Sequence, residues 1–154
     1  MAYVAGPHLI FEFANDEYRR YVGGRDLIGL PLGVAFPELP RERLETVERV
    51  SQQGQPFQDR DSEVWIRRHG QKPEQTFVDL VYQPVPDDAG GVAGVLICVN
   101  DVTAHVRDRR RLEVLAERLA TTEERYRTLF ETLPLGVVHY HADGSTLWAN
   151  PAAG

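Results

Sequence analysis

The sequence has 154 residues, enough for one domain of ordinary size and a connector. Its apolar share of 42% and charged share of 26% are typical of a globular protein, and its formal charge of −6 argues against nucleic acid or an anionic membrane as a partner. No apolar run approaches the roughly 20 residues of a membrane span. Residues 1–6 lack the parts of a secretory signal, so we expect a cytoplasmic protein. The lone cysteine, Cys98, excludes an internal disulfide and a cysteine-based zinc cluster.

The first segment predicts a pair of strands followed by a short helix. Two β-type runs, 3–4 and 9–13, are separated by a Gly-Pro turn signal. Asn15 is suited to the N-cap of a helix, with acidic residues in the first turn, and Gly23-Gly24 ends that helix after about two turns. Residues 25–39 read as short helical turns broken by glycine and proline.

The middle of the sequence predicts one longer helix and three strands. The helix runs from Pro40 to about Gln53, with Gly54 as its stop and one apolar stripe along it. The strands are expected at 63–68, 76–85 and 92–100. Helices on one face of an antiparallel sheet give an α+β fold.

A long helix is predicted to follow, over about 103–133, because the apolar period changes there. Its apolar face repeats at alternating spacings of three and four, which is a heptad seam. We call these residues the seam: Leu112, Leu115, Leu119, Thr122, Tyr126, Leu129 and Leu133. A lone helix offers this narrow apolar stripe little surface to pack against. We therefore predict that it pairs with the same helix of a second chain, as a parallel homodimer. Thr121 and Glu124 also fit a capping box, which leaves open a break near Ala120.

The junction between sheet and helix is expected at Asp101 and Thr103, which we interpret as a signal hinge. Asp101 is placed to accept hydrogen bonds from the helix start, and Thr103 has the chemistry of an N-cap. On that reading, Thr103→Ala weakens the helix start by about 1 kcal/mol.

The end of the chain repeats its beginning. A β-type run at 136–141, the turn Asp143-Gly144 and a second run at 146–148 lead to Ala149-Asn150-Pro151, which corresponds to Ala14-Asn15-Asp16. The repeat stops before the elements that would close a core. We therefore expect residues 136–154 to be frayed or to pair with another chain.

These motifs together resemble the PAS domain family. They are Phe13-Ala14-Asn15 before a helix bearing Tyr18, then Gln83-Pro84, Gly94-Val95, Asp101-Val102-Thr103, and a second opening in 125–130 and 134–138. The resemblance covers the whole chain as a PAS domain at 1–103, a signalling helix at 104–133 and the start of a second, truncated PAS domain at 134–154.

The resemblance implies a five-stranded antiparallel sheet in the order 2-1-5-4-3 with helices on one face around a pocket. It also implies a sensor that binds a small molecule or partner and passes a change down its exit helix. The excess of arginine over lysine favours a bacterial source. In bacteria, the domain that receives the signal from a PAS domain is commonly a histidine kinase of a two-component system, a phosphatase or a cyclic-dinucleotide enzyme. We find no catalytic set in this sequence and expect any catalytic output domain to lie outside it.

The candidate ligand pocket follows from strand alternation and from the apolar residues of the short helices. Its expected lining is Phe11, Phe13, Leu30, Val34, Phe36, Val47, Leu80, Tyr82, Ile97 and Val99. The same residues can instead simply fill a core, which would make the domain a ligand-free dimerisation module.

The common chromophores of the family are not expected here. Flavin-binding relatives use a cysteine on the helix that covers the pocket, but residues 25–55 contain none and Cys98 lies in the last strand. Haem-binding relatives need a histidine, and the 40–53 helix has none, while His8 and His69 fall in predicted turns. The histidines also lack the spacing of a metal site.

Overall fold

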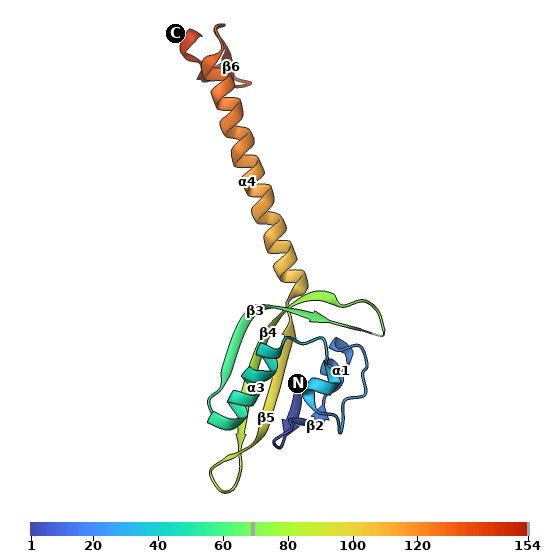
Figure 1. The fold of residues 1–154 in the computed structure, drawn as a ribbon. Coiled ribbons are helices and arrows are strands. Elements are labelled where there is room, and N and C mark those ends of the chain that lie inside the picture. Colours follow the sequence, from blue (N-terminus) through green and yellow to red (C-terminus); the bar gives the residue numbers. More distant parts are fainter. Residues whose placement is uncertain (69, 154) are drawn as a thin grey trace. The chain divides into compact units, whose positions relative to one another are not determined.

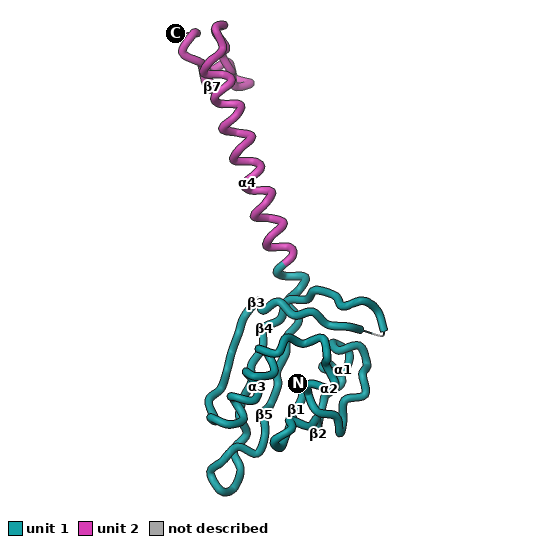
Figure 2. The backbone as a smooth tube through the Cα atoms, viewed as in Figure 1, with its two compact units in different colours: residues 1–106 teal, residues 107–154 magenta. Residues whose placement is uncertain are grey.

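The computed structural model describes residues 1–68 and 70–153, so the predicted turn position of His69 lies outside the described residues. The chain forms two compact units, residues 1–106 and 107–154 (Figure 2). The elements of the first unit are β1 (Ala2–Ala5), β2 (Ile10–Ala14), α1 (Asp16–Tyr21), α2 (Leu32–Ala35), α3 (Arg41–Gln53), β3 (Phe57–Ile66), β4 (Glu74–Pro86) and β5 (Val92–Asp101). Helix α4 (Thr103–Thr132) begins in this unit and continues into the second.

The strands form one five-stranded antiparallel sheet in the order β2-β1-β5-β4-β3, with the short helices and α3 on one face (Figure 1). The predicted α+β class and the predicted strand order are therefore confirmed. Strand β3 begins at Phe57, earlier than expected, because Phe57 is followed by six polar residues, 58–63, and so stands outside any apolar run.

Local signals correctly predicted the N-cap of α1 and the end of α3, while α3 begins at Arg41, one residue after the predicted Pro40. The Asn15 side chain accepts a hydrogen bond from the Tyr18 amide at 2.9 Å and so caps α1. Helix α3 ends at Gly54, whose φ of 66° is left-handed and suits glycine. Val47 and Val50 point from α3 into the core, as the predicted stripe requires.

The core lies between these helices and the inner face of the sheet. Val78, Leu80 and Tyr82 of β4 alternate with more exposed residues, and Val95 and Ile97 do the same on β5. The inner face predicted from alternation is thus confirmed.

The second unit contains most of α4, the strands β6 (Val138–Tyr140) and β7 (Thr146–Ala149), and a 3₁₀ turn, η1 (Pro151–Ala153). The strands pair antiparallel, and the Asn150 side chain accepts a hydrogen bond from the Val137 amide at 2.9 Å while donating to the carbonyls of Phe130 and Leu135. The expected fraying of residues 136–153 is therefore wrong, because a buried asparagine ties this hairpin to the end of its own helix.

Helix α4 is continuous from Thr103 to Thr132. The alternative of a break near Ala120 is not realised. The Thr121 hydroxyl donates to the Glu117 carbonyl at 2.9 Å, which is an interior helix contact and not a capping box.

Candidate functional site

A small apolar cavity lies inside the first unit, between the helices and the inner face of the sheet. Its volume is about 50 Å³, which is room for a few water molecules. It is lined by Tyr18, Tyr21, Val22, Leu32, Phe36, Leu39, Arg43, Val64, Ile66, Val78, Leu80, Tyr82, Ile97 and Val99. Ligand pockets for drug-sized molecules measure roughly 300–1,000 Å³.

Half of the predicted pocket residues line this cavity. They are Phe36, Leu80, Tyr82, Ile97 and Val99. Phe11 and Val47 are buried as expected, but they belong to the surrounding core and do not face the cavity. In that core, Phe11 packs edge-on against the Phe36 ring at 5.9 Å between centroids.

Phe13 is a wrong prediction, since 48% of it is exposed. Tyr3 pairs with Phe13 while the next residue, Val4, pairs with Phe11, so Glu12 is an extra residue in the ladder. This bulge breaks the alternation of β2 and turns both Glu12 and Phe13 toward solvent.

Leu30 and Val34 are also wrong predictions, with exposed fractions of 38% and 63%. The Leu30 carbonyl accepts the Phe11 amide at 3.0 Å, which holds this loop along β2, and the buried neighbours Leu27 and Leu32 occupy the core instead. Val34 follows Leu32 by two residues on a single helical turn, so the two side chains point in different directions.

Several lining residues were missed at the sequence level. Tyr18, Tyr21 and Val22 have the spacing of one helix face, and that spacing was a usable signal. Arg43 gave no such signal. Its guanidinium lies at the cavity wall with the side chain 18% exposed, donates to the Ser62 hydroxyl at 2.6 Å and lies 3.8 Å from the Asp59 carboxylate.

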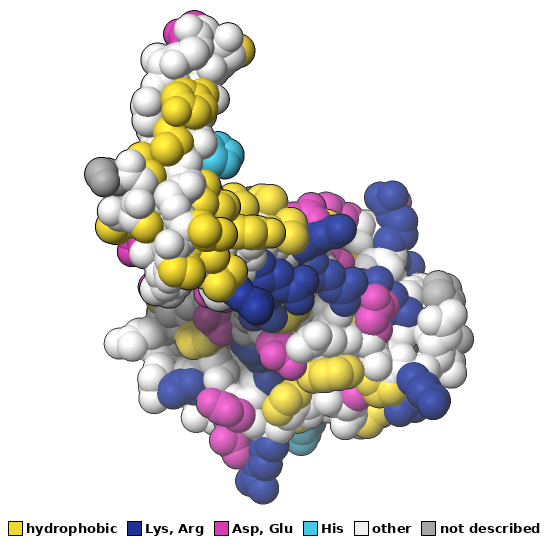
Figure 3. Space-filling view, turned by 90° about the horizontal axis from the view of Figure 1, so that it is seen from above, with side chains coloured by type: hydrophobic (Ala, Val, Ile, Leu, Met, Phe, Trp, Pro, Cys, Tyr) yellow, Lys and Arg dark blue, Asp and Glu magenta, His cyan; other side chains and the backbone are white. Residues whose placement is uncertain are grey.

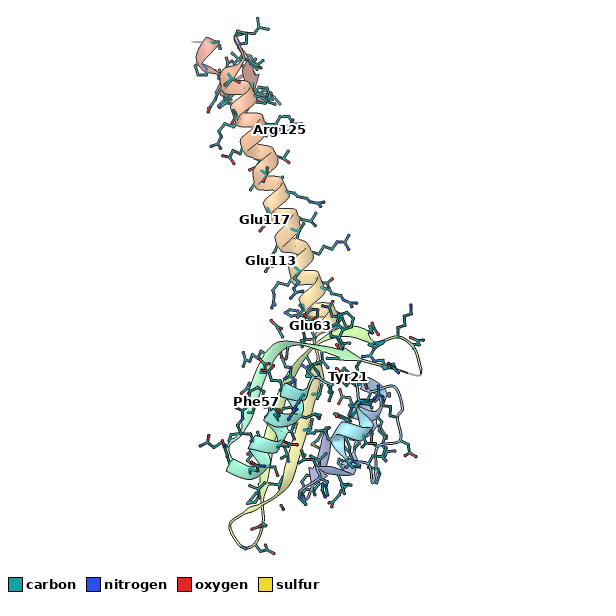
Figure 4. All side chains as sticks on the ribbon, viewed as in Figure 1. Tyr21, Phe57, Glu63, Glu113, Glu117 and Arg125 are labelled. Carbon is teal, nitrogen blue, oxygen red and sulfur yellow. The ribbon has the colours of Figure 1, made fainter. Side chains whose placement is uncertain are left out.

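The polar groups of the cavity are neutral phenols beside one cation. Burial raises the pKa of the Tyr18 hydroxyl, and the neighbouring tyrosine Tyr82 acts in the same direction. Burial also raises the pKa of Tyr82, with Arg43 opposing it. Tyr21 donates or accepts a hydrogen bond with the Thr76 hydroxyl at 3.1 Å (Figure 4 shows Tyr21). Among the described residues that line the cavity, the ionisable groups are thus these three tyrosine hydroxyls and the Arg43 guanidinium.

The junction between β5 and α4 is held by the two predicted hinge residues, one of them in an unexpected way. Asp101 accepts hydrogen bonds from both the amide and the hydroxyl of Thr103, so its expected role at the helix start is confirmed. The N-cap role of Thr103 is wrong, because α4 already begins at Thr103. Its hydroxyl instead accepts the amide of Phe77 on β4 at 2.9 Å. Thr103 thus fastens the helix to the central sheet.

Arg68, which the sequence did not single out, joins this junction to the cavity wall. Its guanidinium donates to the Tyr21 carbonyl at 2.8 Å and to the Asp101 carboxylate at 3.3 Å, and it lies 5.3 Å from the centre of the Tyr21 ring. The Glu74 carboxylate lies 3.7 Å away. One side chain therefore contacts α1, which lines the cavity, and the residue that binds the start of α4.

The seam on α4 is exposed along its length. Its apolar members are between 37% and 66% exposed. Figure 3 colours the surface side chains by type and shows groups of hydrophobic side chains on the face that it views. Tyr126 stacks on Phe130 at 6.3 Å, and Phe130 packs edge-on against Trp148 of the hairpin at 5.6 Å. The hairpin thus contacts Phe130, which stacks on Tyr126, while the seam leucines keep 37% to 66% of their surface exposed.

The strand order, the helices on one face and the helix that leaves the last strand define a PAS-type sensory fold, a signalling module. A family model described as "PAS fold" matches residues 1–107, and one described as "PAS domain" matches residues 124–154. The chain belongs to the PAS family.

A solved structure shares this fold. It is titled "Structure of an RNA-binding Light-Oxygen-Voltage Receptor" and aligns with a TM-score of 0.55 at 20% identity. The alignment covers 82% of this chain and 34% of that one, so the present chain spans about a third of the length of that receptor.

The described part of the chain has no helix both long enough and apolar enough to cross a membrane. Among the same residues, no group of three or more histidine, cysteine, aspartate or glutamate side chains is arranged to hold a metal ion.

Proposed function

We propose that this chain is a dimeric signal-relay segment of a bacterial sensor protein, such as a cytoplasmic sensor histidine kinase. The observation that carries the proposal is the row of exposed leucines on α4. A helix whose heptad stripe stays exposed among the described residues is stabilised by pairing with another helix. The partner is a second copy of this chain, and catalysis belongs to an output domain that the dimer controls.

The size of the cavity favours a relay with a filled core over a ligand sensor. At about 50 Å³ it is well below the roughly 300 Å³ of the smallest ordinary ligand pockets. The side chains do not fit flavin or haem either. Cys98 lies outside the cavity lining, and the described lining residues include no histidine, so they offer neither a cysteinyl adduct nor a histidine ligand for haem iron. In this proposal the core contributes stability and the signal comes from a neighbouring domain.

The contacts at the junction support transmission between sheet and helix. Thr103 bonds to β4 through the Phe77 amide, and Asp101 bonds both to Thr103 and to Arg68. A shift of the sheet therefore acts directly on the first turn of α4. In the reverse direction, rotation of α4 pulls on β4 through the Phe77 contact.

The test is the molar mass in solution, measured by size-exclusion chromatography with light scattering. We expect a dimer at micromolar concentration and a monomer for Leu119→Asp, which places a charge in the seam. Val114→Asp is the matched control, because Val114 is exposed on α4 outside the seam and should leave the dimer intact. A wild-type monomer at high micromolar concentration would sink the proposal.

The filled core is tested separately by native mass spectrometry of the purified protein and by absorbance at roughly 350–450 nm, where flavin and haem absorb. We expect the mass of the polypeptide alone and no absorbance band. A small molecule retained in stoichiometric amount would contradict the filled core and would show that the first unit binds a ligand.

A further inference from the structure

The charges beside the seam specify how two copies of α4 pair. In heptad terms the seam supplies the a and d positions, with Leu119 and Tyr126 at a and Thr122 at d. The residues that flank this stripe in α4 are then Arg111, Arg118 and Arg125 at the g positions before each a, and Glu123 at the e position after Thr122. All four are exposed (Figure 4 labels Arg125 on the helix).

Within a single helix, Arg118 and Glu123 do not face each other. Side chains contact along a helix at separations of three and four residues, and these two are five apart. In a parallel pair of helices in register, however, a g residue of one chain lies beside the e residue of the next heptad of the other chain. Arg118 of one copy then meets Glu123 of the second copy, and the same contact forms a second time by symmetry.

Other arrangements of the same seam are less favourable. In an antiparallel pair the g positions face each other, which would place the arginines at 118 and 125 against arginines of the second copy. A parallel pair staggered by one heptad leaves seam residues at both ends, such as Leu112 and Leu133, without a partner layer. Orientation is thus favoured by charge, and register by the number of paired apolar layers.

Two residues that could disturb such a pairing are already accommodated. Thr122, the polar member of the seam, donates its hydroxyl to the Arg118 carbonyl at 2.8 Å, so its hydrogen-bond donor is satisfied within its own helix. Phe130, at the next e position, packs against Trp148 and His139 of the hairpin in its own unit.

We propose that two copies of this chain pair through α4 in parallel and in register, with Arg118 of each copy in an ion pair with Glu123 of the other. This inference rests on the proposed dimerisation and adds the register of the predicted parallel pair and the two side chains that favour it.

The first experiment exchanges the charges. Arg118→Glu alone places Glu against Glu at both contacts of its homodimer, and Glu123→Arg alone places Arg against Arg. Each should dimerise roughly ten-fold more weakly than wild type, on the scale of exposed ion pairs. Mixing the two variants restores both contacts, so the mixture should form the heterodimer with near wild-type affinity. Arg127→Glu and Glu117→Arg carry the same charge changes away from the seam and should change affinity little.

The second experiment measures register by cross-linking. In a Cys98→Ser background, Leu119→Cys places the two new thiols opposite each other only in a parallel pair in register, so mild oxidation should give a disulfide-linked dimer. Val114→Cys, outside the seam, is the control and should cross-link poorly.

The outcomes separate the two proposals. A dimer that gives no Leu119→Cys cross-link, or one in which the mixed charge variants gain nothing over either alone, would overturn this pairing while leaving dimerisation standing. A monomeric wild-type protein would overturn both. Strong cross-linking together with preferred heterodimer formation supports the arrangement.

Discussion

Thr103→Val tests the junction most directly, because it removes the hydroxyl and nearly preserves side-chain shape. In the wild-type protein that hydroxyl accepts the Phe77 amide at 2.9 Å, and Phe77 is only 2% exposed. Taking an acceptor away from a buried amide costs about 1–3 kcal/mol. The Phe77 carbonyl keeps its bond to the Val102 amide at 2.9 Å, so the strand and the helix start remain linked.

The expected result is a loss of about 1–3 kcal/mol in the free energy of unfolding, measured by urea denaturation. The loss should appear in the sheet. Amide hydrogen exchange should accelerate at Phe77, while residues 107–112 of α4 exchange as in the wild type. A helix N-cap would give the opposite distribution, with faster exchange in the first turns of the helix.

Two further variants make this test specific. Thr103→Ser keeps the hydroxyl and should retain most of the stability. Thr121→Val removes a hydroxyl that bonds only within the exposed part of α4, and it should change stability by no more than about 0.5 kcal/mol. The reasoning is refuted if Thr103→Val leaves Phe77 exchange unchanged, or if Thr121→Val costs as much.

Three other predictions follow from contacts described by the structure. Burial favours a raised pKa for Glu38, but hydrogen bonds from Arg25 and from backbone amides hold that pKa below its ordinary value of 4.5. The carboxylate therefore stabilises the fold above about pH 4.5, and this contribution is lost as the pH falls through the lowered pKa. Glu38→Gln should flatten the acid side of the stability curve, and an unchanged curve would contradict the assignment. Gly94→Ala places a Cβ 2.3 Å from a carbonyl oxygen of β1 and should cost about 2–3 kcal/mol in thermal or urea unfolding, whereas Gly33→Ala, whose nearest contact is 3.4 Å, should cost less than about 1 kcal/mol. Asn150→Ala removes the bonds that tie the hairpin to the end of α4, so amide exchange in β6 and β7 should rise by about ten-fold or more, and unchanged protection there would show that the asparagine is dispensable.

The sequence by itself determined the features that depend on neighbours along the chain. Asn15 caps the start of α1 and Gly54 ends α3, both through local backbone and side-chain chemistry. The alternation of β4 predicted Leu80 and Tyr82 on the inner face of the sheet. The heptad spacing of the seam was equally visible, because period and composition are properties of the sequence. The repeat of Asn15 at Asn150 and the PAS family followed from the order of such local motifs.

Only the tertiary structure decided the features that depend on residues far apart in the chain. The bulge at Glu12 is a register shift between two strands, so no pattern within β2 could show that Phe13 faces solvent. Arg43 is a charged residue that the sequence would place in solvent, but its guanidinium lies at the cavity wall, where it donates a hydrogen bond to Ser62 on β3. Thr103 resembled an N-cap in sequence, yet its hydroxyl bonds to Phe77 because β4 passes beside it. A side chain with several possible hydrogen-bond partners takes the one that folding brings within reach, and that choice is non-local.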